Sequence, residues 1–267
     1  MTQSRYFAHM TTADIAALDK KEGVVILPIG AVEQHGPHLP LLTDTLIANG
    51  GLERTLAQLP DDVKAWALPP MSYGKSNEHI NFPGTITLSA ESLSAVLRDI
   101  GASVARAGFR RLAFLNGHGG NVALLSMVAR DIRVDTGLMC FCVNGLQYGR
   151  PTFEMSDKEW ELGIHGGETE TSLILALAPE LVEMDKAVKF YVDFPAEGTE
   201  LSLFGNAETT WLADDWSESG IFGDATLGTA EKGEALLAAS VENLTKLITV
   251  ISRFEVGQRK GALGFSL

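Results

Sequence analysis

Short apolar runs alternate with amphipathic stretches along most of this chain. The apolar runs cover residues 23–30, 64–74, 111–117 and 138–145, and the first of them reads GVVILPIG. A nearly continuous apolar run of this length that ends in glycine is typical of a strand covered on both faces. The sequence therefore predicts strands at these four places, with the first covered on both faces and the second the weakest.

Helical periodicity fills much of the chain between and after these runs. It covers residues 45–59, 89–107, 121–134, 168–177 and 229–253, and Ser89 with Glu91 and Ser92 forms a typical helix start. Strands that alternate with helices of this length imply crossover connections and a mainly parallel sheet with helices on both faces. Residues 188–224 have no clear period, so we expect loops there and one α/β domain over residues 1–267.

The charge balance excludes several classes of partner. Lys and Arg number 21 and Asp and Glu number 34, which gives a formal charge of −13. Nucleic-acid and anionic membrane surfaces need clustered cations, so we expect neither partner. The chain shows no long apolar span and no signal peptide. Its two cysteines, Cys140 and Cys142, share one face of one apolar run. Together these features predict a reduced, cytoplasmic protein.

Polar side chains follow three of the predicted strands. Residues 31–36 read AVEQHG, residues 76–79 read SNEH and residues 118–121 read HGGN. Because ligands bind outside the carboxyl ends of the strands in an open parallel sheet, we expect these segments to meet at one edge. Candidate substrate contacts are therefore Ser76, His79 and Asn121. For His79, a structural role in holding the following NFPGT loop is an equal alternative.

A set of carboxylates and imidazoles in these segments has the composition of a metal site. Glu33 and His35 are two apart after a strand, so their side chains point the same way. Asp44 follows at the start of a helix, where a helix-dipole contact is the alternative role. Glycines beside His118 leave its imidazole open to a ligand. Such nitrogen and oxygen donors suit Zn²⁺, Mn²⁺ or Fe²⁺, and a bridging Asp44 would allow two ions.

The segment IHGGETETS, residues 164–172, adds a further histidine and two carboxylates. Glu168 and Glu170 lie in the first turn of a predicted helix, where the helix N-terminus stabilises carboxylates. That explanation does not cover His165, which stands just before the turn. A neutral or transiently protonated imidazole at this place fits a general acid–base role.

Four segments resemble the creatininase (creatinine amidohydrolase) family. They are LPIGAVEQHGPHLPLLTDTLIA (27–48), PPMSYGKSNEHINFPGTITLS (69–89), FLNGHGGN (114–121) and HGGETETSLILALAPELV (165–182), in the family order. The resemblance implies a three-layer α/β/α sandwich around a mostly parallel sheet. It also implies a site for two metal ions and, commonly, a homohexamer.

The resemblance also implies roles for single residues. Glu33 and His118 would bind one metal ion, His35 would bind the other and Asp44 would bridge them. His165 corresponds to the catalytic histidine of the family.

One family position differs in this chain. In creatininase itself an aromatic residue and a Glu follow the Gly-His pair, and that Glu completes the second metal site. Gly119 and Gly120 stand at these positions here. The second ion would then lose a ligand, use water or recruit a carboxylate such as Glu168 or Glu170.

We therefore expect a metal-dependent amidohydrolase that cleaves a C–N bond, other than a peptide bond, of a small cyclic or linear amide with an activated water. The tryptophans that enclose the creatinine ring in creatininase have no clear counterparts here, although Trp160 lies nearby. A family member other than strict creatininase is therefore expected. The alternatives are a hydrolase of a cyclic keto-polyol that uses the same two-metal site and a non-catalytic protein that binds a metal or a small molecule.

Overall fold

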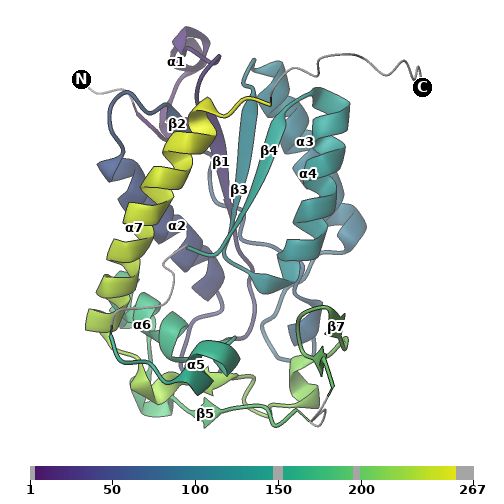
Figure 1. Ribbon diagram of the computed structural model, residues 1–267, viewed down its shortest axis with the longest axis vertical. Coiled ribbons are helices and arrows are strands. Elements are labelled where there is room, and N and C mark those ends of the chain that lie inside the picture. Colours follow the sequence, from purple (N-terminus) through teal and green to yellow (C-terminus); the bar gives the residue numbers. More distant parts are fainter. Residues whose placement is uncertain (1–3, 147–152, 195–198, 257–267) are drawn as a thin grey trace.

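The computed structural model describes residues 4–146, 153–194 and 199–256 (Figure 1). Its centre is a four-stranded parallel sheet in the order β2-β1-β3-β4. The strands are β1 (Val24–Ile29), β2 (Ala65–Ala67), β3 (Arg111–Asn116) and β4 (Met139–Asn144). The parallel sheet predicted from the apolar runs is therefore confirmed. The outermost parts of the predicted single domain, residues 1–3 and 257–267, lie outside the described residues.

Helices cover both faces of this sheet (Figure 1). One face carries α2 (Thr43–Gln58), α6 (Glu168–Leu177) and α7 (Ala230–Arg253), and the other carries α3 (Ala90–Arg106) and α4 (Val122–Thr136). Val24 and Ile26 of β1 pack into the first core, whereas Val25 and Leu27 pack into the second. Every residue of β1 and β3 is buried for this reason. The three-layer α/β/α sandwich is confirmed.

Helix ends agree with the predicted signals to within about two residues. The Ser89 hydroxyl accepts a hydrogen bond from the Ser92 backbone N–H at 3.1 Å and begins α3. A cap of this kind stabilises a helix by about 1 kcal/mol. The second apolar run was predicted as a strand over 64–74, but only residues 65–67 form β2. Beyond Pro69 and Pro70, Met71 returns to the sheet in a single bridge to Ile29.

Helix α7 is long and apolar enough to cross a membrane by length and composition. This property was not expected from the sequence. In the fold, Leu237, Leu244 and Ile248 of this helix belong to the core beside the sheet. A core helix passes the same test, so the apolar content of α7 is explained by its packing.

In its described part, the segment expected to be irregular forms strands of two residues each and one 3-10 turn. Antiparallel β5 (Lys189–Phe190) and β8 (Gly223–Asp224) pair with each other, as do parallel β6 (Leu201–Ser202) and β7 (Ala207–Glu208). The Phe222 ring lies 5.5 Å from Trp211 and 5.8 Å from Phe190, which gives this segment a small aromatic core.

Several short helices were not predicted. Two are α-helices, α1 (Thr12–Ala17) and α5 (Asp157–Leu162). The single 3-10 turns are η1 (Phe7–His9), η2 (Asn77–His79), η3 (Gly119–Asn121), η4 (Pro179–Leu181), η5 (Met184–Lys186), η6 (Ala213–Asp215) and η7 (Ala225–Leu227). Figure 1 places α5, α6 and β5 together at the end of the sheet where the strands finish.

Candidate metal centre

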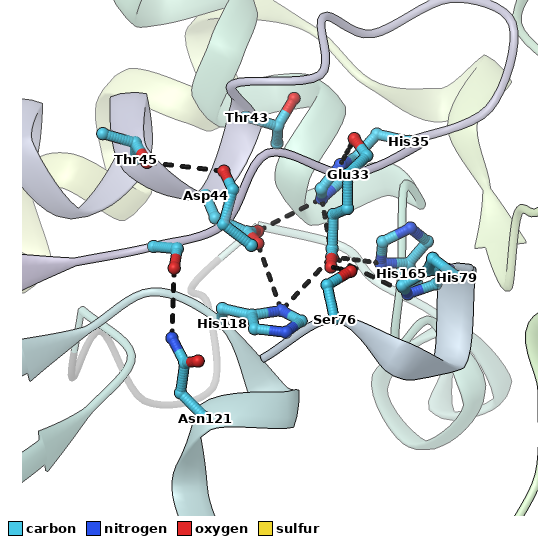
Figure 2. Close-up of polar contacts among 12 residues, drawn as sticks. Glu33, His35, Thr43, Asp44, Thr45, Ser76, His79, His118, Asn121 and His165 are labelled. Atoms are coloured by element: carbon cyan, nitrogen blue, oxygen red, sulfur yellow. Dashed lines mark hydrogen bonds and ion pairs between the residues drawn. The ribbon is translucent and has the colours of Figure 1, made fainter. Parts of the chain in front are cut away.

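The predicted ligands converge beyond the carboxyl ends of β1 and β3 (Figure 2). Glu33 and His35 lie in the loop after β1, Asp44 lies in the first turn of α2, and His118 follows β3. All four side chains are buried, with exposures between 0% and 4%. Segments from different parts of the chain therefore build one enclosed polar site.

The nitrogen and oxygen atoms of these four residues lie close together. Nε2 of His35 is 3.1 Å from Oδ1 of Asp44. Nδ1 of His118 is 3.2 Å from Oε1 of Glu33 and 3.2 Å from Oδ2 of Asp44. Asp44 thus faces both imidazoles, one with each carboxylate oxygen, which is the arrangement expected of a bridging carboxylate.

Hydrogen bonds orient these side chains. His35 Nδ1 lies 3.2 Å from the Glu33 carbonyl oxygen, and His118 Nε2 lies 2.9 Å from the Lys75 carbonyl oxygen. Since each of these nitrogens donates to a carbonyl, the other nitrogen of each ring is directed at the carboxylates. The Ser76 hydroxyl donates to Oε2 of Glu33 and holds that side chain. Partners of this kind are what fixes ligand geometry in metal sites.

Three buried carboxylate oxygens in the described part of the chain have no hydrogen-bond partner. Oε1 of Glu33 and Oδ2 of Asp44 lie in this site, whereas Oε2 of Glu168 belongs to the carboxylate that pairs with Lys232. Burial and the neighbouring Asp44 raise the pKa of Glu33 to about 7. Burial alone would lower the pKa of His35, but the Asp44, Glu170 and Glu33 carboxylates together outweigh it and raise this pKa to about 9. Unpaired buried oxygens are costly unless a cation binds them, so the site fits divalent ions.

His165 and His79 form a second layer of the site. Nδ1 of His165 lies 3.8 Å from Glu33 Oε1, and Nε2 of His79 lies 3.7 Å from the same atom. Burial and the charge of His35 hold the pKa of His165 well below its usual value and lower that of His79 to about 3. His165 Nε2 donates to the Gln34 carbonyl at 2.7 Å. The His165 Nδ1 atom therefore faces the centre as a neutral proton acceptor.

The two carboxylates at the start of α6 occupy different surroundings. Oε2 of Glu170 lies 3.8 Å from His35 Nε2 and accepts a hydrogen bond from the Gly166 backbone at 2.6 Å. Ligand atoms of His35, His165 and Glu170 fall within 4.8 Å of one another. The Glu168 carboxylate instead forms an ion pair with Lys232. Of the two, Glu170 is therefore the one placed to serve a metal ion.

Asn121 sits at the centre of the loops rather than beside the carboxylates. Its Oδ1 accepts a hydrogen bond from the Lys75 backbone at 2.8 Å, and its Nδ2 donates to the Gly30 carbonyl at 3.1 Å. Its side chain is fully buried. These contacts tie the loop after β1 to η2 and η3, which favours a structural role over the predicted substrate contact.

One carboxylate of the site was not predicted. Glu78 in η2 places Oε1 at 3.5 Å from His118 Nε2, and Glu33, Glu78 and His118 form another set whose ligand atoms lie within 4.8 Å of one another. The signal in the sequence was its position next to His79 in the polar segment SNEH.

A cavity of about 200 Å³ opens beside His118 and Glu170. Its other lining residues combine apolar side chains with two amides and include Ile47, Asn116, Val122, Asn144, Leu146 and Leu173. A second cavity, of about 230 Å³, touches Glu170 from the side of Trp160. Open space therefore lies on two sides of Glu170, and the cavity beside His118 is the one that touches two residues of the site.

Comparison with known sequences agrees with this geometry. The sequence profile described as Creatininase, creatinine amidohydrolase, matches residues 8–248. This chain belongs to the creatinine amidohydrolase family. It is accordingly an enzyme, a hydrolase of the amidohydrolase type, and the family resemblance seen in the sequence is confirmed.

Curated family members carry several activities in their names. A mycofactocin precursor peptide peptidase of Mycolicibacterium smegmatis is 35% identical over 82% of this chain and 81% of its own length. A creatinine amidohydrolase of Pseudomonas putida is 29% identical over 93% and 97%. A 3-dehydro-scyllo-inosose hydrolase of Thermotoga maritima is 28% identical over 95% and 86%.

Solved structures of the family share the fold. A putative creatinine amidohydrolase from Bacteroides fragilis superimposes with a TM-score of 0.80 at 28% identity, covering 97% of this chain and 100% of its own. A creatininase variant described as Zn–Zn type gives a TM-score of 0.75 at 26% identity, covering 92% and 97%. Another neighbour is a creatininase described as a Mn form. The family thus includes divalent-metal enzymes.

Proposed function

We propose that this protein is a metal-dependent amidohydrolase that holds two divalent ions per chain. Glu33 and His118 would bind one ion, His35 and Glu170 the other, and Asp44 both. The observation that carries the proposal is the pair of buried oxygens on Glu33 and Asp44 that accept no hydrogen bond within the described residues. Zinc, manganese and iron all suit this nitrogen and oxygen set.

Ions of this kind, when bound, lower the pKa of a coordinated water toward neutrality and polarise a carbonyl group. The chain supplies the proton transfer. His165 Nδ1 faces the site and is neutral at pH 7, because burial and His35 lower its pKa. It takes a proton from the attacking water and delivers it to the leaving amide nitrogen. The hydrogen bond from His165 Nε2 to the Gln34 carbonyl keeps the ring in this orientation.

We infer that the substrate is a linear, peptide-like amide. The peptide peptidases share 33% to 35% identity with this chain, compared with 29% for the creatinine amidohydrolase. The cavity beside His118 offers an apolar wall that includes Ile47 and Leu146, together with the amides of Asn116 and Asn144. This lining suits an extended chain that presents both an apolar group and peptide amides.

A hydrolase of a cyclic keto-polyol is the second candidate. A relative named for an inosose substrate covers 95% of this chain, and the described residues that line the cavity beside His118 include no tryptophan. Such a substrate would use the same metal centre and the same His165. A non-catalytic metal-binding protein is the third reading, and the placement of His165 against the ligand set counts against it.

Metal analysis and a turnover panel test the proposal. Metal-loaded protein should contain about two ions per chain and hydrolyse short peptides or N-formyl amides. Turnover of keto-inositols alone would favour the second candidate, and no turnover on any panel member would favour the binding protein. The His118→Ala variant should lose metal and activity together. Unchanged metal content in this variant would contradict the assigned role of His118.

We also propose that the protein is a cytoplasmic homo-oligomer, a hexamer by analogy with its family, that acts on a small molecule. The formal charge of −13 supports the absence of nucleic-acid and membrane partners. Light scattering coupled to size exclusion would give the number of chains, and a monomer would contradict the oligomer.

A further inference from the structure

Gly120 and Glu78 share one small volume behind His118. A Cβ atom built on Gly120 would lie 2.2 Å from Oε1 of Glu78, 2.3 Å from the Lys75 carbonyl oxygen and 2.5 Å from His118 Nε2. Non-bonded atoms do not approach so closely, so position 120 cannot carry a side chain while Glu78 stays in place. The glycine is thus what admits the Glu78 carboxylate to this volume.

The Glu78 carboxylate reaches the ligand set from this position. Its Oε1 lies 3.5 Å from His118 Nε2, the nitrogen that donates to the Lys75 carbonyl. A ligand atom of Glu78 also lies within 4.8 Å of ligand atoms of both Glu33 and His118, and this spacing is what places Glu78 in the ligand set. The side chain is 21% exposed and comes from η2, which also carries His79. The atoms thus stand close to the mutual spacing of ligands around one divalent ion.

An independent observation indicates that a cation belongs beside this carboxylate. Glu33 Oε1, the atom 3.2 Å from His118 Nδ1, is fully buried and accepts no hydrogen bond within the described residues. Asp44 Oδ2, which lies 3.2 Å from the same nitrogen, is also buried and accepts no hydrogen bond within the described residues. A third carboxylate next to two unpaired ones adds repulsion unless a divalent ion offsets it.

We propose that Glu78 is a further ligand of the ion held by Glu33 and His118. Its carboxylate comes from η2 and has room there because Gly120 carries no side chain. The family resemblance places a Glu of the second metal site at position 120 in creatininase, whereas in this chain a carboxylate enters that volume from η2 and would serve the ion of Glu33 and His118. The inference rests on the proposed metal centre and adds a residue to it.

The test compares metal binding by the wild type with that of three variants. Glu78→Gln keeps the shape of the side chain and removes its charge, whereas Glu78→Asp keeps the charge and withdraws it by one methylene. Glu22→Gln removes one exposed carboxylate from a surface turn and serves as the control. The ion-free proteins are titrated with Mn²⁺ by calorimetry, and the Co²⁺-loaded proteins are examined by visible absorption, which reports the coordination number.

Both Glu78 variants should bind Mn²⁺ at least about 10-fold more weakly than the wild type and should change the Co²⁺ spectrum. The Glu22→Gln variant should match the wild type in both measurements. Wild-type affinity and spectrum in Glu78→Gln would overturn the inference. Wild-type behaviour of Glu78→Asp alone would also overturn it, because the carboxylate would then act by charge rather than by ligation. A wild-type protein that binds no metal would instead contradict the proposed function itself.

Discussion

The imidazole rings of His79 and His165 stack with their centroids 4.2 Å apart and their planes 22° apart. A charge on one ring opposes a charge on the other at this separation, and both rings are buried. Both histidines are therefore neutral in the folded protein at neutral pH. This pairing has consequences for stability and for catalysis.

The stability of the ion-free protein should depend on the charge of His79. Its folded pKa is about 3, below the value of about 6.5 in an unfolded chain, so the unfolded state binds more protons between these values. His79 therefore lowers the free energy of unfolding as the pH falls from about 6.5 toward 3, by up to about 1.4 kcal/mol per pH unit.

The His79→Gln variant isolates this effect. Urea unfolding of the ion-free wild type and variant at pH 4 to 7 should show that the variant loses less stability on acidification. Parallel curves for the two proteins would mean that His79 titrates alike in both states.

His165 should be required for turnover and not for metal content. The His165→Asn variant removes the proton acceptor that faces Glu33, and loss of a general acid–base group typically lowers kcat by about 10²- to 10⁴-fold. The measurement combines kcat on the best substrate of the panel with elemental analysis. Loss of both metal ions from this variant would instead make His165 a ligand.

Metal binding should release protons and strengthen as the pH rises. In the ion-free protein the pKa of His35 is about 9 and that of His118 is raised by Glu33 and Asp44 despite burial, so both rings are protonated at pH 7.5. Each must lose a proton to bind a metal ion. The apparent affinity should therefore increase between pH 7 and 9, by up to tenfold per pH unit for each released proton.

Calorimetry in two buffers of different ionisation enthalpy measures the number of protons released. Values near one or two per chain are expected at pH 7.5, and a buffer-independent enthalpy would contradict this prediction. The comparison has the advantage that it needs no substrate.

Glu168 and Glu170 should respond differently to the same substitution. Glu170→Gln removes a carboxylate whose pKa is raised by burial, so it should lower the metal content and leave stability unchanged or higher. Glu168→Gln breaks the ion pair with Lys232 and should lower the free energy of unfolding by about 1–2 kcal/mol while metal content stays at the wild-type value. Thermal melting of both variants measures the change in stability, and elemental analysis measures the metal content. Equal metal loss in the two would contradict the assignment of Glu170.

The sequence predicted the fold well where local pattern decides structure. β1 and β3 are continuous apolar runs, and their burial on both faces follows directly from that pattern. The second run was predicted too long because its apolar composition continues past the point where Pro69 and Pro70 end regular pairing. The short helix α5 lacks the length that makes a helical period recognisable.

The part of the site that follows the strands could be predicted, because the predicted sheet fixes where those residues lie. Glu33, His35 and His118 follow strands, so the parallel sheet itself brings them together. Glu78 was missed because its position depends on Gly120, forty-two positions further along the chain, which leaves the space it occupies. Contacts of that range are not visible in a local pattern.

The sequence did not show which of Glu168 and Glu170 would face the site, although the two lie two residues apart on one helix. Positions two apart on an α-helix point in nearly opposite directions, so only one of the pair can face the site. Which one does so is decided by the packing of α6 against α7, where Lys232 meets Glu168.

Glu159, a buried carboxylate in α5, joins three segments through its two oxygens. It accepts hydrogen bonds from the Glu168 backbone at 2.8 Å, the Asp224 backbone at 2.9 Å and the Tyr191 hydroxyl at 2.7 Å. Gly167 precedes α6, and a Cβ atom built on it would lie 2.5 Å from Oε1 of Glu159. A chimaera that replaces the segment around Phe222 with that of a relative would therefore have to keep Glu159 and its three partners. Without these contacts, the loop that carries His165 would no longer be held against that segment.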